Sequence, residues 1–263
     1  MLNAMESLQD KACLVTGGTR GIGRAIALML LQEGARVAIS GRTPESVESA
    51  LEFFNSEASN KTSNKVIGKA ADLRHYGEVE ELFRYVDGSL GGLDVLVNNA
   101  GIGVFGSTGE LPIEDWKRTI ETNLYGSFYC SRMALTRFGT RGGGFIVNIV
   151  SLAGAHAFAG GAAYNASKFG LTGFSEALMQ DVRSRNVRVS YVMPGSVATE
   201  FGSDPSGSSP RQEGLPSPPR LAPGTDWKVW PEDVAEVVRM LLKMPARTLV
   251  SRVEVRPSQP KSK

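Results

Sequence analysis

Short apolar runs rich in β-branched residues alternate with longer amphipathic runs along almost the whole chain. The short runs predict strands at 11–17, 35–41, 65–70, 93–98, 144–150, 187–193 and 249–255. Because these runs are continuously apolar, the strands are expected to be buried on both faces. The alternation predicts an α/β fold, a Rossmann-like doubly wound sheet of about seven parallel strands with helices on both faces.

The amphipathic runs lie between these strands. They predict helices at 21–33, 44–57, 76–90, 113–138, 164–185 and 231–243. In the last run, Val234, Val238 and Leu241 recur at helical spacing, so this helix is expected to bury one apolar stripe against the sheet. We expect a single domain over residues 1–263, in which 1–10 and 258–263 are flexible ends.

The segment 202–225 interrupts the alternation. It is rich in Ser, Pro and Gly, has no apolar periodicity, and follows a predicted strand. A linker to a second domain is disfavoured because little chain follows it. Two interpretations stay open: a mobile surface loop, or a lid over a substrate site at the carboxyl end of the strand.

Composition narrows the classes of function. With 41% apolar residues, 21% charged residues and a net charge of +2, the chain gives no sign of a nucleic-acid or membrane partner. Cys13 and Cys130 are far apart and match neither a metal-ligand nor a redox spacing, so we expect no metal and a reducing, cytoplasmic location. The first ten residues carry no recognisable secretory signal.

A glycine-rich turn, TGGTRGIG, joins the first predicted strand to the first predicted helix. Gly17, Gly21 and Gly23 lie where absent Cβ atoms let the backbone approach a pyrophosphate at the positive end of the helix. This pattern favours dinucleotide binding. Its G-x-x-x-G-x-G spacing differs from the commoner fingerprint, and a purely structural turn is the alternative.

The second strand indicates which dinucleotide is bound. It ends in ISGRT, so Ser40 and Arg42 stand where an NAD-binding protein usually places an acid for the ribose hydroxyls. Without that acid, Arg20 and Arg42 could both bind a 2′-phosphate through charge-assisted hydrogen bonds. We therefore expect NADP(H) as the preferred cofactor and NAD(H) as the alternative. In the opposing interpretation, both arginines are only solvated.

The stretch YNASK puts Tyr164 and Lys168 on one face of a helix. An ammonium beside a phenol stabilises the phenolate and is expected to lower the tyrosine pKa from its usual value of about 10. Such a pair also arises by chance in many helices, so it needs further support.

That support comes from NNAG at 98–101, TNLYG at 122–126 and NIVSLAG at 148–154. With the glycine turn and YNASK, these motifs closely resemble the short-chain dehydrogenase/reductase (SDR) family across nearly the whole chain. The resemblance implies a catalytic tetrad of Asn123, Ser151, Tyr164 and Lys168. Tyr164 would exchange a proton with the substrate oxygen, and Ser151 would hold that oxygen. Lys168 would lower the tyrosine pKa and bind the nicotinamide ribose, and Asn123 would position a water.

The motifs and the resemblance together define a predicted cofactor site. Its residues are Gly17, Thr19, Arg20, Gly21, Ile22, Gly23, Ser40, Arg42, Asp72, Leu73, Asn99, Ala100, Gly101, Tyr164, Lys168, Pro194, Gly195, Val197 and Thr199. The resemblance implies that Asp72 contacts the adenine and that 194–199 meets the nicotinamide and its phosphates. For Asn98 and Asn99, capping of the local backbone is an open alternative.

The predicted substrate pocket lies just beyond the strand ends. It comprises Val104, Phe105, Leu152, Ala153, Phe158 and Phe201, with Gly103, His156 and Gly195 beside them. Because most of these residues are apolar, the expected substrate is a modest-sized, uncharged carbonyl or secondary alcohol. His156 is expected to lie on the surface. By resemblance, helices 113–138 and 164–185 would associate into a homotetramer, with a dimer as the alternative.

The predicted function is an NADP(H)-dependent oxidoreductase that moves a hydride between nicotinamide and a carbonyl or secondary alcohol. Two alternatives stay open, a non-catalytic NADP(H)-sensing protein and a 3-oxoacyl-thioester reductase. The chain ends in LVSRVEVRPSQPKSK where ketoacyl reductases carry a glycine-rich strand, which disfavours the second. The glycine spacing disfavours an epimerase of nucleotide sugars.

Overall fold

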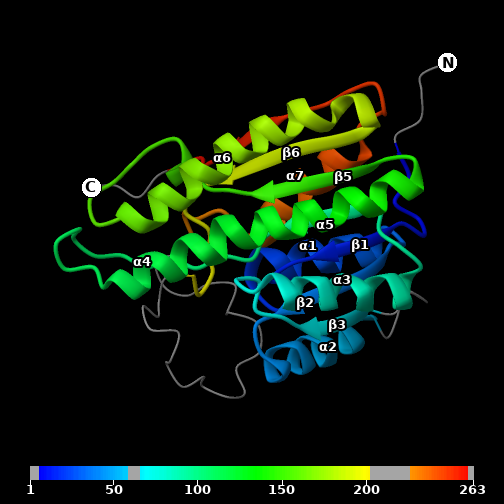
Figure 1. Cartoon of the computed structure of the whole chain (residues 1–263), viewed down its shortest axis with the longest axis horizontal. Helices are drawn as coiled ribbons and strands as arrows, with labels where there is room; N and C mark the ends of the chain where they lie inside the picture. The colour runs from blue at the N-terminus through cyan, green and yellow to red at the C-terminus, as the bar shows by residue number, and fades with distance from the viewer. Residues whose placement is uncertain (1–5, 59–65, 202–225, 260–263) are drawn as a thin grey trace.

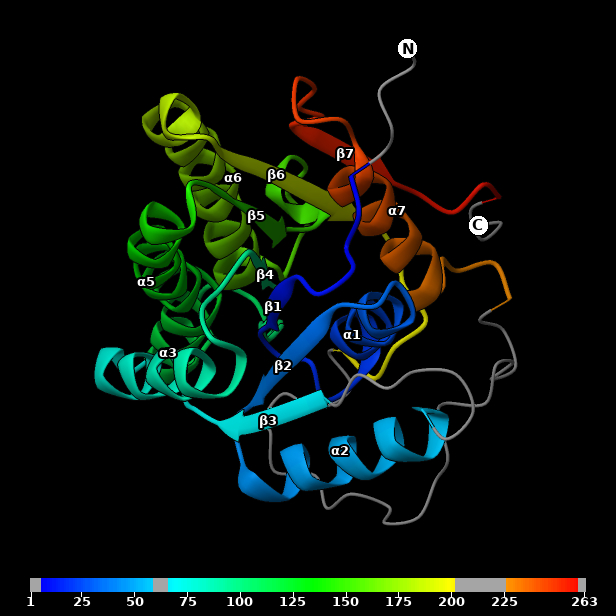
Figure 2. The ribbon, with the colours of Figure 1, turned by 90° about the vertical axis from the view of Figure 1, so that its right-hand side faces the viewer.

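The computed structural model describes residues 6–58, 66–201 and 226–259. Seven parallel strands form one sheet in the order β3-β2-β1-β4-β5-β6-β7 (Figure 1, Figure 2). The strands are β1 (Ala12–Val15), β2 (Arg36–Gly41), β3 (Val66–Ala70), β4 (Val95–Asn98), β5 (Gly144–Ile149), β6 (Val187–Pro194) and β7 (Arg252–Val255). The predicted doubly wound sheet is confirmed. The strand order reverses between β1 and β4, and in such sheets ligands bind outside the carboxyl ends of the strands at that point.

Helices cover both faces of the sheet. They are α1 (Gly21–Gln32), α2 (Pro44–Ala58), α3 (Tyr76–Leu90), α4 (Ile113–Ile120), α5 (Gly126–Arg141), α6 (Ala162–Val182) and α7 (Pro231–Lys243). Figure 2 shows α1, α2 and α7 against one face and α3, α5 and α6 against the other. Cys13 and Val15 of β1 pack with the first set, and Ala12 and Leu14 pack with the second. This burial on both faces explains the continuous apolar runs.

The predicted helix 113–138 contains a change of helix type. α4 ends at Ile120, the next residues form a π-helical turn (Glu121–Tyr125), and α5 continues to Arg141. Single π turns inside α-helices occur frequently at functional sites. This one carries Asn123, which is fully buried.

The described part of the N-terminal end is anchored. Leu8 is buried, and main-chain bonds join Glu6 N to Lys243 O (3.1 Å) and Asp10 N to Gly34 O (2.9 Å). Leu8 packs into the apolar cluster of α1 and α7, and the flexibility predicted for 1–10 stays a prediction. Residues 1–5, 260–263 and the candidate lid 202–225 lie outside the described residues. Within the described ranges, no helix is long and apolar enough to cross a membrane.

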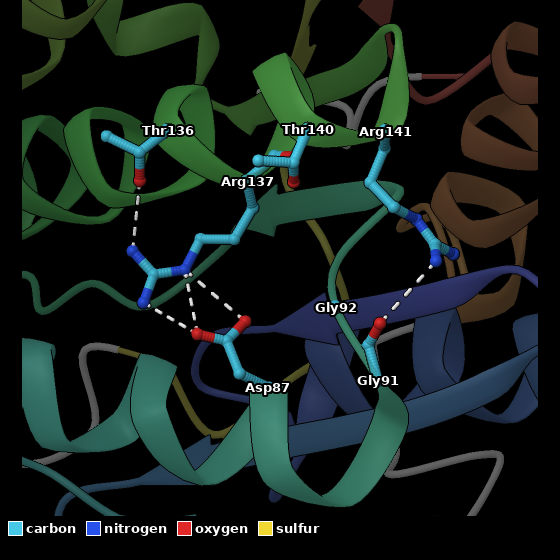
Figure 3. Close-up of a pocket in the computed structure, with 7 residues that line it drawn as sticks. All are labelled: Asp87, Gly91, Gly92, Thr136, Arg137, Thr140 and Arg141. Carbon is cyan, nitrogen blue, oxygen red and sulfur yellow. Dashed lines mark hydrogen bonds and ion pairs between the residues drawn. The ribbon is translucent and has the colours of Figure 1, made fainter.

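An open depression lies between α3 and α5, at the end of the sheet opposite the carboxyl ends of the strands (Figure 3). It measures about 490 Å³ and is lined by Asp87, Gly91, Gly92, Thr136, Arg137, Thr140 and Arg141. Its arginines already have protein partners. Arg137 binds Asp87 at 2.7 Å and Met133 O at 3.1 Å, and Arg141 binds Asp94 at 2.7 Å. We therefore interpret the depression as a junction between elements and not as a ligand site.

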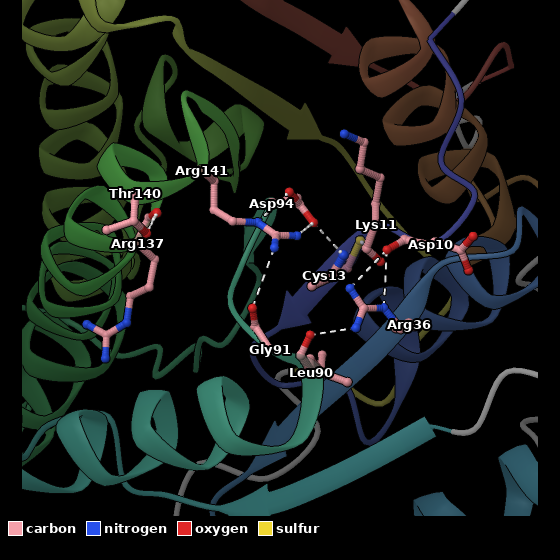
Figure 4. Close-up of polar contacts among 11 residues, drawn as sticks. Asp10, Lys11, Cys13, Arg36, Leu90, Gly91, Asp94, Arg137, Thr140 and Arg141 are labelled. Carbon is pink, nitrogen blue, oxygen red and sulfur yellow. Dashed lines mark hydrogen bonds and ion pairs between the residues drawn. The ribbon is translucent and has the colours of Figure 1, made fainter.

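Asp94 is central to the polar contacts at this end of the sheet (Figure 4). Its carboxylate accepts hydrogen bonds from Arg141 at 3.2 and 2.7 Å and from Ala12 N at 2.8 Å. Burial opposes ionisation of this carboxyl, but these bonds outweigh it and hold its pKa below the ordinary value. Asp94 therefore ties the end of α5 to the start of β1.

Replacing Asp94 by alanine is expected to lower the free energy of unfolding at pH 7 by about 2 kcal/mol, because it leaves the buried Ala12 N–H without its acceptor. Since the folded pKa is depressed, this contribution is complete above the unfolded pKa of about 3.9 and disappears as the pH falls through the lower folded value. Urea denaturation over a pH series measures both effects. Glu114→Ala removes an exposed ion pair with Lys117 and serves as the control, which should lose much less. Equal losses would contradict the role of Asp94.

Candidate active site

The glycine turn after β1 is pressed against the segment that follows β4. Gly17 and Gly21 have φ angles of 61° and 52°, which residues with a Cβ rarely adopt. A Cβ at Gly17 would lie 2.8 Å from Ala100 Cα, and a Cβ at Gly23 would lie 2.2 Å from Gly17 O and 2.4 Å from Asn99 Nδ2. The turn therefore presents bare main chain and the N-terminus of α1, an arrangement that suits a pyrophosphate.

Asn99 fastens this turn. Its Nδ2 donates to Thr16 O and Gly17 O, both at 3.0 Å, and Thr16 Oγ1 accepts from the main-chain N–H groups of Asn99 and Ala100. The side chain of Asn99 thus caps the local backbone, which was the alternative left open by the sequence. Asn98 instead joins a buried polar network, in which its Nδ2 donates to Asn148 Oδ1 at 2.9 Å.

The end of β2 lies beside the same turn. Gly18 N donates to Ser40 O at 3.0 Å, and a Cβ at Gly41 would lie 2.6 Å from Thr19 Cγ2. Ser40 is buried, whereas Arg42 is exposed. This strand end therefore offers a basic side chain, and no acid, beside the glycine turn.

Arg20 pairs with a residue that the sequence did not single out. Its Nη1 lies 3.1 Å from Glu200 Oε2, and both side chains are more than half exposed. Thr199 lies against the same turn, because a Cβ at Gly21 would be 3.3 Å from Thr199 Cγ2. Ile22 packs partly buried against the core. Glu200 is therefore placed to compete with a bound anion for Arg20.

Asp72 and Leu73 follow β3. The Asp72 carboxylate accepts from Arg74 Nε at 2.9 Å, and although burial acts in the other direction, the bonds from Arg74 hold its pKa below the ordinary value. Leu73 is buried, and a Cβ at Gly126 would lie 3.0 Å from Leu73 Cβ. Leu73 therefore also contributes to the packing of α5 against the sheet.

The predicted P-G segment begins where β6 ends, at Pro194. Gly195 lies beside the loop after β5, since a Cβ there would be 3.0 Å from Leu152 Cδ1. Val197 forms an isolated parallel bridge with Val229, which joins this segment to the residues before α7. Such pairing fixes the path of the chain over the carboxyl ends of the strands.

Ser151, Tyr164 and Lys168 come together beyond β5. Tyr164 and Lys168 lie in the first two turns of α6, and Ser151 forms a hydrogen bond with Tyr164. Lys168 Nζ donates to Ile149 O at 3.0 Å and lies 5.8 Å from the centroid of the Tyr164 ring. Tyr164 is 9% exposed and Lys168 is 4% exposed. Tyr164 and Lys168 are thus nearly shielded from water, where electrostatic effects are strong, and Ser151 beside them is partly buried.

Asn123 stands behind this group. Its Oδ1 accepts from Ile102 N at 2.8 Å, and its Nδ2 donates to Ile102 O and to Ser167 Oγ, both at 2.9 Å. A Cβ at Gly101 would lie 3.2 Å from Asn123 Oδ1 and 3.7 Å from Lys168 Nζ. The amide therefore joins the loop after β4 to α6, and these bonds use both its N–H groups. The predicted role in holding a water remains a prediction.

The pKa of Tyr164 is raised, and not lowered as the sequence predicts. Burial raises the pKa of Tyr164 to about 12, although the hydrogen bond with Ser151 acts in the lowering direction. Burial also lowers the pKa of Lys168 to about 8. The phenol is therefore protonated at neutral pH. That is the form required of a general acid.

Two of the predicted pocket residues pack against Tyr164, and a third packs against one of them. The ring centroids of Phe105 and Phe201 are each 5.6 Å from that of Tyr164, and Phe158 lies 5.9 Å from Phe105. Val104 and Ala153 are buried and Leu152 is partly buried, so the first two offer little surface to a substrate. His156 is exposed, as predicted, and its Nε2 lies 3.4 Å from Arg256 Nη2.

Asn165 is a positioning residue that the sequence analysis missed. Its Nδ2 donates to Ala153 O at 2.8 Å and to His156 O at 3.3 Å, and its Oδ1 accepts from Phe158 N at 3.3 Å. It therefore fixes the loop between Ser151 and α6. The available signal was its place beside Tyr164 in a first helical turn, where asparagine often bonds to nearby backbone.

The profile of the short chain dehydrogenase family matches residues 11–206, and the chain belongs to this family of oxidoreductases. A 3alpha-hydroxysteroid dehydrogenase of Mediterraneibacter gnavus is 33% identical, over 74% of this chain and 76% of that protein. The alcohol dehydrogenase of Thermococcus sibiricus, solved with 5-hydroxy-NADP, superposes with a TM-score of 0.82 at 27% identity, over 96% of this chain and 99% of that one. A metagenomic short-chain oxidoreductase in complex with NADP is 32% identical with a TM-score of 0.78, over 97% and 100% of the two chains.

Proposed function

We propose that the protein is an NADP(H)-dependent oxidoreductase that transfers a hydride between nicotinamide and a carbonyl or secondary alcohol of a small, largely uncharged substrate. The observation that carries the proposal is the placement of Ser151, Tyr164 and Lys168 beyond the end of β5, with Tyr164 and Lys168 buried and Lys168 Nζ 5.8 Å from the centroid of the tyrosine ring. When bound, NADPH would supply the hydride. Every proton in the step must then come from the protein or from water.

In reduction, Tyr164 gives its hydroxyl proton to the substrate oxygen while that oxygen is held by Ser151. A phenolate is left at Tyr164, and the Lys168 ammonium is close enough to stabilise it, since its Nζ lies 5.8 Å from the ring centroid. Lys168 is in turn oriented by Ile149 O. Oxidation reverses these transfers, with the phenolate as base.

The glycine turn, Arg20 and Arg42 support NADP(H) as the preferred cofactor, with NAD(H) as the alternative. The turn has no room for a side chain at Gly17 or Gly23, which fits a cradle for pyrophosphate. Arg20 and Arg42 flank it without an acid at the end of β2. The relatives solved with NADP and with 5-hydroxy-NADP support the same choice.

Replacing both Arg20 and Arg42 by alanine is expected to raise KM for NADPH by about 100-fold, as loss of two charge-assisted contacts would do, and to leave KM for NADH nearly unchanged. The measurement is the ratio of kcat/KM for the two cofactors. Glu200→Gln is the matched variant: it releases Arg20 from its ion pair, so KM for NADPH should hold or fall. An unchanged cofactor ratio in the double variant would contradict the NADP assignment.

The alternatives differ in what they require of these residues. A protein that only senses NADP(H) has no need of a proton donor bonded to Ser151, and a 3-oxoacyl-thioester reductase must accept a carrier-bound chain. NADPH oxidation with a panel of ketones, diketones, aldehydes and keto esters, with NADH run in parallel, tests the proposal. Binding of NADPH without turnover of any carbonyl would favour the sensing protein.

We also propose a homotetramer, with a dimer as the alternative, formed through α5 and α6. These helices and the turn before them carry exposed aromatic residues: Tyr125 (47%), Phe128 (43%) and Phe169 (45%). Phe128 packs edge-on against Phe174 of α6, so the two helices share one aromatic face. Exposed apolar patches of this kind often mark contacts between proteins.

A further inference from the structure

Three phenylalanines gather at the mouth of the candidate active site, one from each of three neighbouring strand ends. Phe105 lies in the loop after β4, Phe158 in the loop after β5, and Phe201 in the segment after β6. They are 43%, 48% and 44% exposed. Large apolar side chains left this open beside a proton donor indicate a surface that a ligand would cover.

The rings are held in defined places. Phe105 meets the Tyr164 ring edge-on at 74°, Phe201 is tilted by 53° to the same ring, and Phe158 is tilted by 49° to Phe105. A Cβ on Gly103 would lie 2.7 Å from Phe201 and 2.8 Å from Phe105. The absence of a side chain at Gly103 is therefore what lets these two rings converge over Tyr164.

The third ring is seated in the same way. A Cβ on Gly161 would lie 2.6 Å from Phe158 Cε2 and 2.7 Å from its Cζ. The loop that carries Phe158 is fixed by Asn165, whose Oδ1 accepts from Phe158 N. Two glycines and one buried asparagine thus set the positions of a ring cluster that remains open to solvent on one side.

We propose that Phe105, Phe158 and Phe201 form an aromatic clamp that selects substrates carrying an aryl group near the reacting carbonyl. The inference rests on the proposed function, because the carbonyl must be held by Ser151 and Tyr164. Aromatic pairs at centroid distances of about 4.5–7 Å in edge-on or offset arrangements gain free energy beyond the area they bury. An alkyl or cyclohexyl group of the same size fills the space without that gain.

The clamp also limits where the aryl group lies relative to the carbonyl. Phe105 and Phe201 are 5.6 Å from the Tyr164 ring, centroid to centroid. An aryl ring that contacts them while the carbonyl oxygen meets the tyrosine hydroxyl must be separated from the carbonyl carbon by a short spacer. The clamp therefore favours an arylalkyl ketone or the corresponding alcohol.

A pair of ketones tests the clamp directly. 4-Phenyl-2-butanone and 4-cyclohexyl-2-butanone have the same chain, and two methylene groups insulate the carbonyl from the ring, so their intrinsic reactivity is closely similar. With NADPH, the wild-type protein should reduce the phenyl compound with a kcat/KM about tenfold higher than that for the cyclohexyl compound. Two aromatic pairs would give a preference of this size. A ratio near one would overturn the clamp.

Phe105→Leu and Phe201→Leu should each bring this ratio down several-fold, mainly through KM for the phenyl ketone. Phe169→Leu is the control, because Phe169 is equally exposed (45%) on α6 but belongs to no ring contact around Tyr164 among the described residues. It should keep the wild-type ratio. Equal behaviour of all three variants would overturn the clamp.

Failure of the clamp and failure of the proposed function give different results. If other carbonyls are reduced but the two test ketones show no preference, the clamp is overturned and the function stands. If no carbonyl oxidises NADPH, saturation-transfer NMR of the two ketones with the protein and NADP⁺ decides the clamp. Stronger transfer to the phenyl compound, lost in Phe105→Leu, supports it, and equal transfer overturns it.

Discussion

Replacing Tyr164 by phenylalanine is expected to lower kcat for carbonyl reduction by about 10³-fold, the usual contribution of a positioned general acid. The substitution keeps the ring that packs with Phe105 and Phe201 and removes only the hydroxyl bonded to Ser151. Binding of NADPH should therefore change little. Steady-state NADPH oxidation and a fluorescence titration of NADPH measure the two effects separately.

Tyr191 provides the matched control. It is 3% exposed, its hydroxyl donates to Glu176 Oε1 at 2.6 Å, and its pKa is also raised to about 12, chiefly by burial. A raised pKa alone therefore does not distinguish the catalytic tyrosine. Tyr191→Phe should keep kcat and lose about 1 kcal/mol of stability with its hydrogen bond. Similar activity in the two variants would contradict the assigned role of Tyr164.

Replacing Gly23 by alanine is expected to reduce NADPH affinity by more than about 100-fold and to destabilise the fold by about 1–3 kcal/mol, the usual cost of overpacking. The added Cβ would lie 2.2 Å from Gly17 O and 2.4 Å from Asn99 Nδ2, so both the glycine turn and its fastening must shift. A fluorescence titration of NADPH and urea denaturation provide the measurements.

Gly88→Ala is the control for this substitution. Gly88 lies exposed in α3, and a Cβ there would meet nothing within 4 Å. Alanine should therefore leave NADPH binding unchanged and stabilise the helix by about 0.5–1 kcal/mol. If Gly23→Ala bound NADPH as the wild type does, the glycine turn would not be the cofactor cradle.

The sheet and the place of the candidate catalytic group could be predicted because they depend on local patterns. Strands buried on both faces read as apolar runs, and parallel strands place their carboxyl ends at one edge of the sheet. The motifs that follow the carboxyl ends of the strands are therefore expected to lie close together. The π turn at Asn123 could not be predicted, because the spacing of apolar residues does not show where the main-chain hydrogen bonds change from the α-helical to the π-helical pattern.

Contacts between segments that are far apart in the chain could not be predicted from the sequence either. The ion pair of Arg20 with Glu200 joins residues 180 positions apart, and only the path of the segment after β6 brings them together. The pKa of Tyr164 was predicted in the wrong direction for the same reason. The spacing shows that an ammonium is near, but it does not show that both groups are buried, and burial decides the direction.

We propose that Tyr164 and its neighbours reduce a carbonyl with hydride from NADPH. The most direct measurement incubates the protein with a carbonyl panel and NADPH in which both hydrogens at the nicotinamide C4 are deuterium, and analyses the alcohols by mass spectrometry. We expect an alcohol with one deuterium on the carbinol carbon, formed about 10³-fold more slowly by Tyr164→Phe. Tight binding of NADPH with no labelled alcohol from any carbonyl, or equal labelling by wild type and variant, would contradict it.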